Sequence, residues 1–303
     1  MAIFIPTGLN SGIVMKKELG KLGLGGVTFG REINQQTAFA LIDHAYENEI
    51  YSFDTAAVYG GGVSEEIIGQ WLTKNPSKAK RIHVATKIVP PFDSKTIIAN
   101  VEQSLLRLGV DRIDVLYFHR WDDQLNHPES WLALEQLMFE GKIKTVGVSN
   151  FNIAQLETAI NLLQIITPLR ISYIQNNHNL AVSEVSTGLV KCCQTNAIKI
   201  ITFSPLGAGF LTGKHLLGVA SGSRFELMPG HQSIYFNDHA EKRLIKLLEV
   251  AKKTGYDPAY LALAWAIHQP QTDQVLVGGR SIAQLDLALA AAQFYDEEIF
   301  GKL

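Results

Sequence analysis

The sequence has little cysteine and no long apolar run, and each lack excludes a class of protein. Its two cysteines, Cys192 and Cys193, are adjacent in a segment predicted to be helical, where their side chains diverge. A disulfide between them is therefore not expected, and a reducing compartment fits. No stretch reaches the roughly 18 apolar residues that span a bilayer, and the first 17 residues lack the pattern of a signal peptide. We expect a cytoplasmic protein.

The sequence also lacks an excess of one charge, a metal motif and a linker. With 27 Lys and Arg against 29 Asp and Glu, the formal net charge is −2, and nothing predicts binding to nucleic acid or a membrane surface. The nine histidines show neither paired ligand spacing nor a carboxylate-rich companion motif, so we predict no metal. No low-complexity stretch divides the chain, and we expect a single domain over 1–303.

Short apolar, β-branched runs alternate along the chain with longer segments of helical period. This alternation is typical of parallel strands joined by crossover helices. The predicted strands are 22–29, 52–56, 82–88, 114–119, 145–150, 171–176, 198–204 and 274–279. The predicted helices lie near 34–48, 64–74, 94–108, 128–141, 152–164, 183–196, 257–268 and 281–293.

Eight strands and eight helices over 303 residues favour a (β/α)8 TIM barrel over an open sheet. Two pieces are additional: an N-terminal extension over 1–20, and an inserted loop plus helix over about 207–256, before the last strand. The predicted N-caps include Ser64, Asn152 and Ser281. We expect "GLGG" at 23–26 to be a close approach of backbone within strand one, and apolar side chains to fill the barrel interior.

Four titratable residues stand where predicted strands end, at the face where such barrels place their active sites. They are Asp54, Tyr59, Lys87 and His119. Singly, each has an ordinary structural interpretation as a loop cap, a core aromatic, a surface lysine or a buried histidine. Together they suit proton transfer, because an ammonium lowers the pKa of a nearby phenol, a carboxylate holds that ammonium, and an imidazole can orient a substrate oxygen.

Motifs spread over nearly the whole chain give it a family resemblance. They are "FDTAAVYGGGVSEEIIG" (53–69), "ATK" (85–87), "DVLYFHR" (114–120), "GVSNF" (147–151), "YIQNNHNL" (173–180), "FSPLGAGFLTGK" (203–214) and "VLVGGRSIAQL" (275–285). In this order they resemble the aldo-keto reductases, which are NAD(P)-dependent carbonyl reductases built on a (β/α)8 barrel.

The resemblance implies a role for each site residue. Tyr59 would be the general acid that protonates the carbonyl oxygen, Lys87 and Asp54 would tune it, and His119 would direct the substrate. Ser149, Asn150 and Gln175 would bind the nicotinamide carboxamide, and Phe203 would stack on the nicotinamide ring. The further cofactor-binding positions are Ser204, Leu206, Gly209, Lys214, Gly279, Arg280, Ser281 and Gln284.

Within that set, the loop at 204–214 would wrap the pyrophosphate, assisted by Lys214. Arg280 and Ser281 stand where relatives bind a ribose 2′-phosphate, which favours NADPH while NADH stays open. The sequence departs from the family at Leu287 and Ala288, where an acidic residue and an asparagine usually hold the adenine.

Clues to the substrate are few. Phe29, Trp121 and Phe151 follow predicted strands and could line a pocket or simply pack, and 215–238 is long enough to form a lid. Asp122 and Asp123 could bind a polyol or remain solvated. The sequence ends with "FYDEEIFGKL", which leaves little of the C-terminal tail that closes the pocket in some members of the family, so we expect an open pocket.

We therefore expect an NADPH-dependent reductase of an aldehyde, ketone or sugar carbonyl, with the reverse, dehydrogenase direction also open. A redox-sensing subunit with little turnover is the alternative from another class, because the family includes subunits that accompany potassium channels. A Schiff-base lyase using Lys87 is a third hypothesis, opposed by the tyrosine and carboxylate beside that lysine. A small-molecule carbonyl compound is the expected partner, and a homo-oligomer is open.

Overall fold

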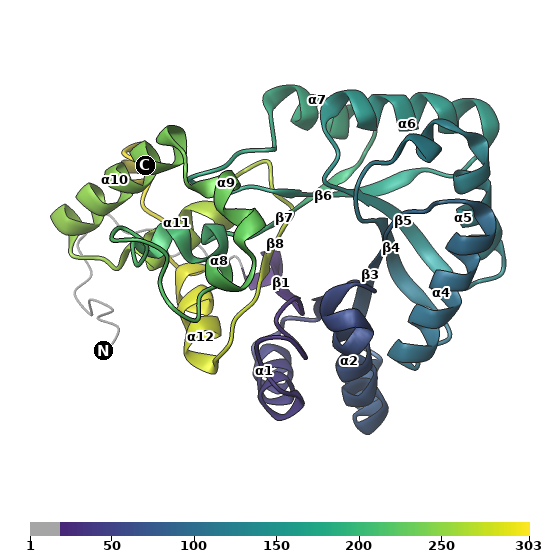
Figure 1. Cartoon of the computed structure of the whole chain (residues 1–303), viewed down its shortest axis with the longest axis horizontal. Helices are drawn as coiled ribbons and strands as arrows, with labels where there is room; N and C mark the ends of the chain where they lie inside the picture. Colours follow the sequence, from purple (N-terminus) through teal and green to yellow (C-terminus); the bar gives the residue numbers. More distant parts are fainter. Residues whose placement is uncertain (1–18) are drawn as a thin grey trace.

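Eight parallel strands close into a barrel in the computed structural model, which describes residues 19–303. Each strand pairs with the next in sequence, and the last pairs with the first (Figure 1). The strands are β1 (Leu22–Gly25), β2 (Ser52–Asp54), β3 (His83–Ile88), β4 (Ile113–Phe118), β5 (Ile143–Ser149), β6 (Ile171–Asn177), β7 (Lys199–Phe203) and β8 (Gln274–Val277). The predicted (β/α)8 fold is confirmed.

Helices follow the strands and cover the outside of the barrel (Figure 1). The α-helices are α1 (Gln35–Glu47), α2 (Val63–Lys74), α3 (Pro76–Ala79), α4 (Ser94–Leu108), α5 (Pro128–Phe139), α6 (Ile153–Ile166), α7 (Thr187–Thr195), α8 (Arg224–Leu227), α9 (Gln232–Tyr235), α10 (Asp238–Thr254), α11 (Pro258–Ile267), α12 (Ile282–Ala291) and α13 (Glu297–Gly301). The short 3-10 helices are η1 (Leu19–Lys21), η2 (Tyr59–Gly62), η3 (Asp123–Asn126), η4 (Gly207–Thr212) and η5 (Pro229–His231).

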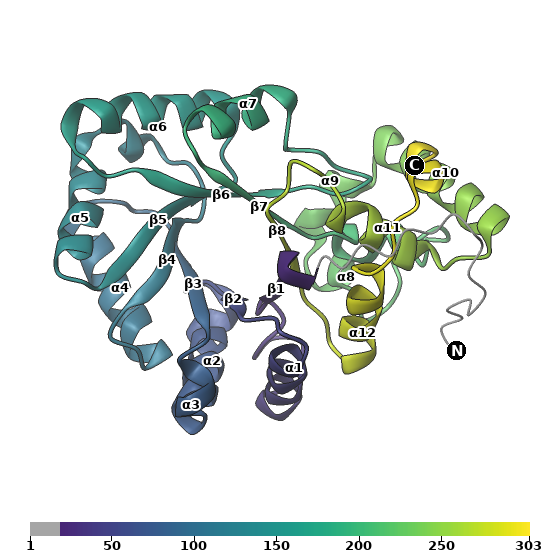
Figure 2. The same ribbon diagram turned by 180° about the vertical axis from the view of Figure 1, so that it is seen from behind.

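Both additional pieces of the prediction can be located. The insertion before the last strand is present as η4, α8, η5, α9 and α10 between β7 and β8. The predicted extension lies almost entirely outside the described residues. Figure 2 views the barrel from behind, the side on which the purple η1 lies. None of the helices within 19–303 is both long and apolar enough to cross a membrane.

Several predicted strands were too long, because the chain leaves the sheet early to form the barrel mouth. Strand β1 ends at Gly25, and the next amide, of Gly26, donates to Asp54 O at 2.8 Å. A Cβ on Gly26 would lie 2.9 Å from Ser64 Oγ, so the predicted close approach is confirmed. The predicted cap at Ser64 was wrong: Gly62 holds the N-cap position of α2, while Ser64 Oγ donates to Gly26 O at 2.8 Å.

The main core lies between the strands and the surrounding helices. Phe53 of β2 packs edge-on against Trp71 of α2, with 5.8 Å between ring centroids, and Phe118 of β4 packs against Trp131 of α5 at 5.1 Å. All four rings are buried. The barrel interior differs from expectation near the N-terminal ends of the strands, where charged and polar side chains such as His83 and Lys144 line a cavity instead of an apolar filling.

Candidate active site

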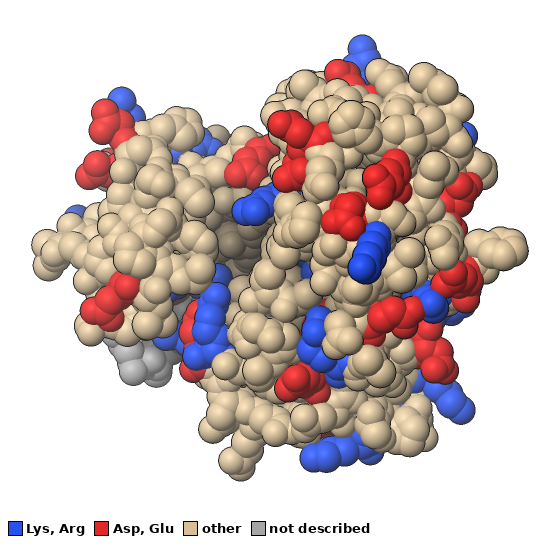
Figure 3. Space-filling view, turned by 45° about the vertical axis from the view of Figure 1, so that its right-hand side comes forward, with Lys and Arg blue, Asp and Glu red and all other residues tan. Residues whose placement is uncertain are grey.

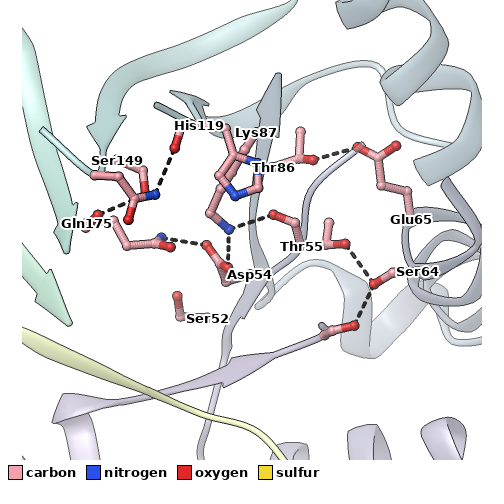
Figure 4. A network of polar contacts seen from close by, with 12 residues as sticks. Ser52, Asp54, Thr55, Ser64, Glu65, Thr86, Lys87, His119, Ser149 and Gln175 are labelled. Carbon is pink, nitrogen blue, oxygen red and sulfur yellow. Dashed lines mark hydrogen bonds and ion pairs between the residues drawn. The ribbon is translucent and has the colours of Figure 1, made fainter. Parts of the chain in front are cut away.

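The four predicted catalytic residues meet at the C-terminal mouth of the barrel. Asp54 ends β2, Lys87 lies in β3, His119 follows β4 and Tyr59 opens η2. The Lys87 ammonium donates to the Asp54 carboxylate and, at 2.8 Å, to Thr55 O (Figure 4). It also lies 5.1 Å from the centroid of the Tyr59 ring, which packs edge-on against His119 with 5.8 Å between ring centroids. The predicted convergence is therefore present.

The Asp54–Lys87 pair is deeply buried, with Lys87 1% and Asp54 4% exposed. Burial raises the pKa of Asp54, opposed by the charge and hydrogen bond of Lys87. Burial acts to lower the pKa of Lys87, but Asp54 and Tyr59 outweigh it and the pKa is raised. The donor Gln175 on Asp54 and the acceptor Thr55 O on Lys87 favour the ionised pair.

The pKa of Tyr59 corrects the expectation that Lys87 would bring it toward neutrality. Burial raises this pKa above its ordinary value, and the opposing charge of Lys87 does not cancel the effect. Tyr59 is therefore a neutral phenol at physiological pH. Such a group can donate its proton, and the adjacent ammonium favours the phenolate that this donation leaves.

His119 is neutral as well. Burial, with the charges of Lys87 and Arg120, lowers its pKa to about 3. Its backbone carbonyl accepts from Asn150 Nδ2 at 2.8 Å, which ties β4 to the end of β5. A neutral imidazole at this place can hydrogen-bond a substrate oxygen without adding a charge.

A second buried polar cluster supports the wall behind Lys87, and sequence analysis missed it. Glu65 of α2 is fully buried and accepts from Thr86 Oγ1 at 2.5 Å (Figure 4). It also pairs with Arg107 Nε at 2.6 Å. Thr55 Oγ1 lies 2.8 Å from Ser64 Oγ in the same region. The only signal for this cluster in the sequence was Glu65, an acidic residue inside the 53–69 motif, because its partners come from distant helices and strands.

The three residues predicted to bind the carboxamide lie together beside the catalytic tetrad, which is Asp54, Tyr59, Lys87 and His119. Ser149 Oγ donates to Gln175 O at 2.8 Å, and Asn150 Nδ2 donates to Ser149 Oγ at 3.1 Å. Gln175 Nε2 donates to Asp54 Oδ2 at 2.8 Å. The side chain expected to contact the cofactor thus also bonds to a catalytic carboxylate, which links the two sets.

The loop after β7 has the geometry of a phosphate cradle. Phe203 ends β7, and the residues after it turn with positive φ, including Ser204 at 55°, Ala208 at 56° and Gly209 at 93°. The φ of 93° at Gly209 favours glycine, and a Cβ there would also lie 3.0 Å from Lys214 Nζ. Successive amides in such turns form an anion-binding concavity, so this loop and Lys214 fit a pyrophosphate. Leu206 precedes the turn and packs against the core.

The loop after β8 places a second cation near the first. Burial and the charge of Arg280 lower the pKa of Lys214, and the charge of Glu32 opposes them. Two neighbouring cations fit a ligand with several phosphate charges. Arg280 Nη1 donates to Gly222 O at 3.0 Å, and Gln284 Oε1 accepts from Arg280 N at 2.7 Å.

Other residues of this loop contribute less. Gly279 O accepts from Thr28 Oγ1 at 3.0 Å, and Ser281 holds the N-cap position of α12 without a capping side-chain bond. Ala288 is buried and Leu287 is partly buried against the core, so these departures from the family pattern offer no polar group to an adenine.

The predicted aromatic wall is mostly packing. Phe29 and Phe151 are each 1% exposed, so they are core residues rather than a surface for substrate. Trp121 is partly exposed and packs edge-on against Phe151 at 5.2 Å. Asp122 caps η3 by accepting from Gln124 N at 3.0 Å, which gives it a structural role, while Asp123 is exposed.

The predicted lid at 215–238 crosses to the loop after β1. Arg224 Nη2 lies 3.2 Å from Glu32 Oε1, and Arg31 Nη1 donates to Met228 Sδ at 3.3 Å. In the space-filling view, a hollow separates the part of the molecule at the left from the rest, with Lys and Arg side chains at its rim (Figure 3).

Within the described part of the chain, no three His, Cys, Asp or Glu side chains are grouped to hold a metal ion.

Comparisons of the sequence with known proteins identify the family. The chain is 30% identical over 288–292 residues to two proteins: the L-glyceraldehyde 3-phosphate reductase of Escherichia coli O157:H7 (89% of this chain, 84% of that protein) and the probable aldo-keto reductase 1 of Glycine max (90% and 81%). It is 29% identical to the probable voltage-gated potassium channel subunit beta of Arabidopsis thaliana (89% and 88%). The sequence profile of the aldo/keto reductase family matches residues 21–300, and the chain belongs to that family.

Proposed function

We propose that the protein reduces the carbonyl group of an aldehyde, ketone or sugar with NADPH, and that Tyr59 is the general acid. The observation that carries this proposal is the buried Asp54–Lys87 pair beneath the neutral Tyr59 phenol and the His119 ring. When bound, the nicotinamide would supply the hydride, which is the chemistry of the cofactor rather than of the protein.

The residues of this chain would position the reactants and move one proton. Ser149, Asn150 and Gln175 would fix the nicotinamide ring over the strand ends, and His119 would hold the carbonyl oxygen near Tyr59. As negative charge develops on that oxygen, the phenol proton would move to it. The Lys87 ammonium would then favour the phenolate that remains.

Lys87 itself is a poor candidate for Schiff-base chemistry. An amine must lose its proton to attack a carbonyl, whereas Asp54 holds this group as an ammonium with a raised pKa.

The proposed preference for NADPH is supported by Arg280 and Lys214, whose charges suit an additional phosphate. Under the same proposal, the protein acts in the cytoplasm on a small carbonyl compound, alone or as a homo-oligomer.

The test is oxidation of NADPH and of NADH by the purified protein with a panel of aldehydes, ketones and sugars, run beside Tyr59→Phe. We expect turnover with NADPH that falls by roughly 10²–10⁴-fold in the variant while the cofactor still binds. Oxidation of alcohols and sugars with NADP⁺ tests the reverse direction. Cofactor binding without turnover would favour the alternative, a cofactor-binding subunit with little turnover; the Arabidopsis relative is named as a probable potassium channel subunit.

A further inference from the structure

A cavity enters the barrel from the end opposite the catalytic mouth. It has a volume of about 360 Å³, and we call it the lower chamber. Its outer part is lined by His83, Asp114, Lys144, Lys199, Asp273 and Gln274. Its inner part reaches Asp54 and Gln175, which are two members of the active site. Of the catalytic tetrad, only Asp54 borders this chamber among the described residues, so it is approached from the side away from Tyr59 and His119.

The sequence explains why this part of the barrel is hollow. Inward-facing positions alternate along each strand, and several that usually carry branched apolar residues are small here, including Ser52, Ala85 and Thr145. At Gly147 a Cβ would lie 2.4 Å from the Tyr117 ring, so glycine lets that ring lie flat against β5. Small side chains below Asp54 therefore leave the space open.

The chamber carries polar groups from its outer end to Asp54, beside an apolar part formed by Ala85, Val115, Ile201 and Leu276. The polar part of its wall combines the outer charges with the side chains of Thr145, Tyr173, Tyr117 and Gln175. A polar cavity holds ordered water where several hydrogen-bonding groups are in reach, and 360 Å³ is far above the roughly 30 Å³ that one water occupies in the liquid. Water in the chamber would hydrogen-bond to Asp54 from below, while Lys87 and Gln175 already bond to its two oxygens.

We propose that the lower chamber is a water-filled proton path that resupplies the tetrad through Asp54, from the N-terminal end of the barrel. This inference rests on the proposed reductase function. A substrate held at the catalytic mouth would cover Tyr59 from the other side, so a path from below can act while product is still bound.

The proton balance is simple. In each reduction the Tyr59 O–H bond breaks as the O–H bond of the alcohol forms, and the phenolate then takes a proton from Lys87. Asp54, which borders the chamber and bonds to Lys87, takes a proton from chamber water and passes it to the Lys87 amine, and the hydroxide left in the chamber is reprotonated by bulk solvent. One proton enters from solvent for each carbonyl reduced, and no further oxidant or reductant is needed.

Blocking the chamber is the direct kinetic test. Val115→Phe fills it, and Tyr117→Phe with Thr145→Val removes two wall hydroxyls at almost constant volume. Leu116→Met is the matched control, because Leu116 lies on the same strand but outside the chamber lining. We expect kcat to fall about tenfold in the chamber variants, with a larger solvent isotope effect and an unchanged KM for NADPH, and neither change in the control. Unchanged kcat and isotope effect in both chamber variants would overturn the proposal.

An accessibility measurement tests the chamber without any turnover. Ala85→Cys, in a background with Cys192→Ser and Cys193→Ser, places a thiol in the chamber next to Asp54. We expect methyl methanethiosulfonate to label it much faster than a thiol at Leu116→Cys, and equal, slow labelling would contradict an open path. Absence of carbonyl turnover in the wild type would refute the reductase function alone, since the labelling result does not depend on it.

Discussion

The two sides of the barrel hold their polar groups in different ways. On the β2–β4 side, Asp54, Lys87 and Glu65 are buried and bond to other side chains or to backbone across strands. On the β7–β8 side, Lys214 and Arg280 lie in loops, and Arg280 bonds to Gly222 O in another loop and to the Gln284 side chain at the start of α12. The first side is organised by contacts within the protein, whereas the second carries its cations and turned backbone amides on loops.

This difference indicates where each side obtains its precision. A buried ion pair with additional donors holds its geometry because any displacement leaves a charge unpaired. Displacing a cation in a loop costs less free energy, and such a cation is stabilised most by a ligand that carries several negative charges. Substitutions on the β2–β4 side should therefore affect stability and rate together, and those on the β7–β8 side should affect mainly cofactor affinity.

The largest expected effect is that of Lys87→Met. The variant leaves Asp54 buried without its cation, so we expect a loss of about 3–5 kcal/mol in the free energy of unfolding. It also removes the charge beside Tyr59, so kcat should fall by roughly 10²–10⁴-fold. Urea denaturation and steady-state kinetics measure the two effects.

A double variant separates those effects. Asp54→Asn with Lys87→Met removes both charges, and it should regain most of the stability without regaining the rate. Lys214→Met is the matched control on the other side and should change the free energy of unfolding by no more than about 0.5 kcal/mol. Equal destabilisation by Lys87→Met and Lys214→Met would contradict the comparison.

The features that could be predicted from the sequence are local ones. The short apolar, β-branched runs that alternate with helical segments predicted the barrel, and the polar residues at their ends predicted the convergence of Asp54, Lys87 and His119, because parallel strands bring their C-terminal ends to one face. Asn152 was also predicted as an N-cap, and it forms a capping box with Gln155.

The features that could not be predicted depend on how deeply a side chain is buried and on partners that are far away in the sequence. The partner of Glu65, Arg107, is 42 residues away on another helix, and no local pattern pairs them. The ammonium beside Tyr59 was foreseen, but its effect on the pKa was overestimated because burial of the phenol cannot be gauged from neighbours in sequence. The period of "DVLYFH" would have placed Tyr117 inside the barrel, yet the hollow beneath it depends on all the strands at once.

A smaller effect is expected for Arg280→Ala. If Arg280 binds a 2′-phosphate, its loss should weaken NADPH binding about tenfold and leave NADH binding within about twofold. Fluorescence titration with each cofactor measures the two affinities. Arg81→Ala, in the turn before β3, is the control. Equal weakening for both cofactors would assign Arg280 to the pyrophosphate or to loop structure through its bond to Gly222.

The last expected effect concerns pH and the catalytic side. The folded pKa of His119, about 3, lies below the value of about 6.5 for an unfolded chain. Below pH 6.5 the unfolded chain binds a proton that the folded protein does not, so this contribution to stability is present above pH 6.5 and is lost as the pH falls toward 3. The free energy of unfolding of His119→Gln should therefore fall by about 2 kcal/mol less than that of the wild type between pH 7 and pH 5. Denaturation at the two pH values measures it, with the exposed His239→Gln as control. If the two variants lose stability equally, the His119 imidazole is more solvated than its burial at the barrel mouth implies.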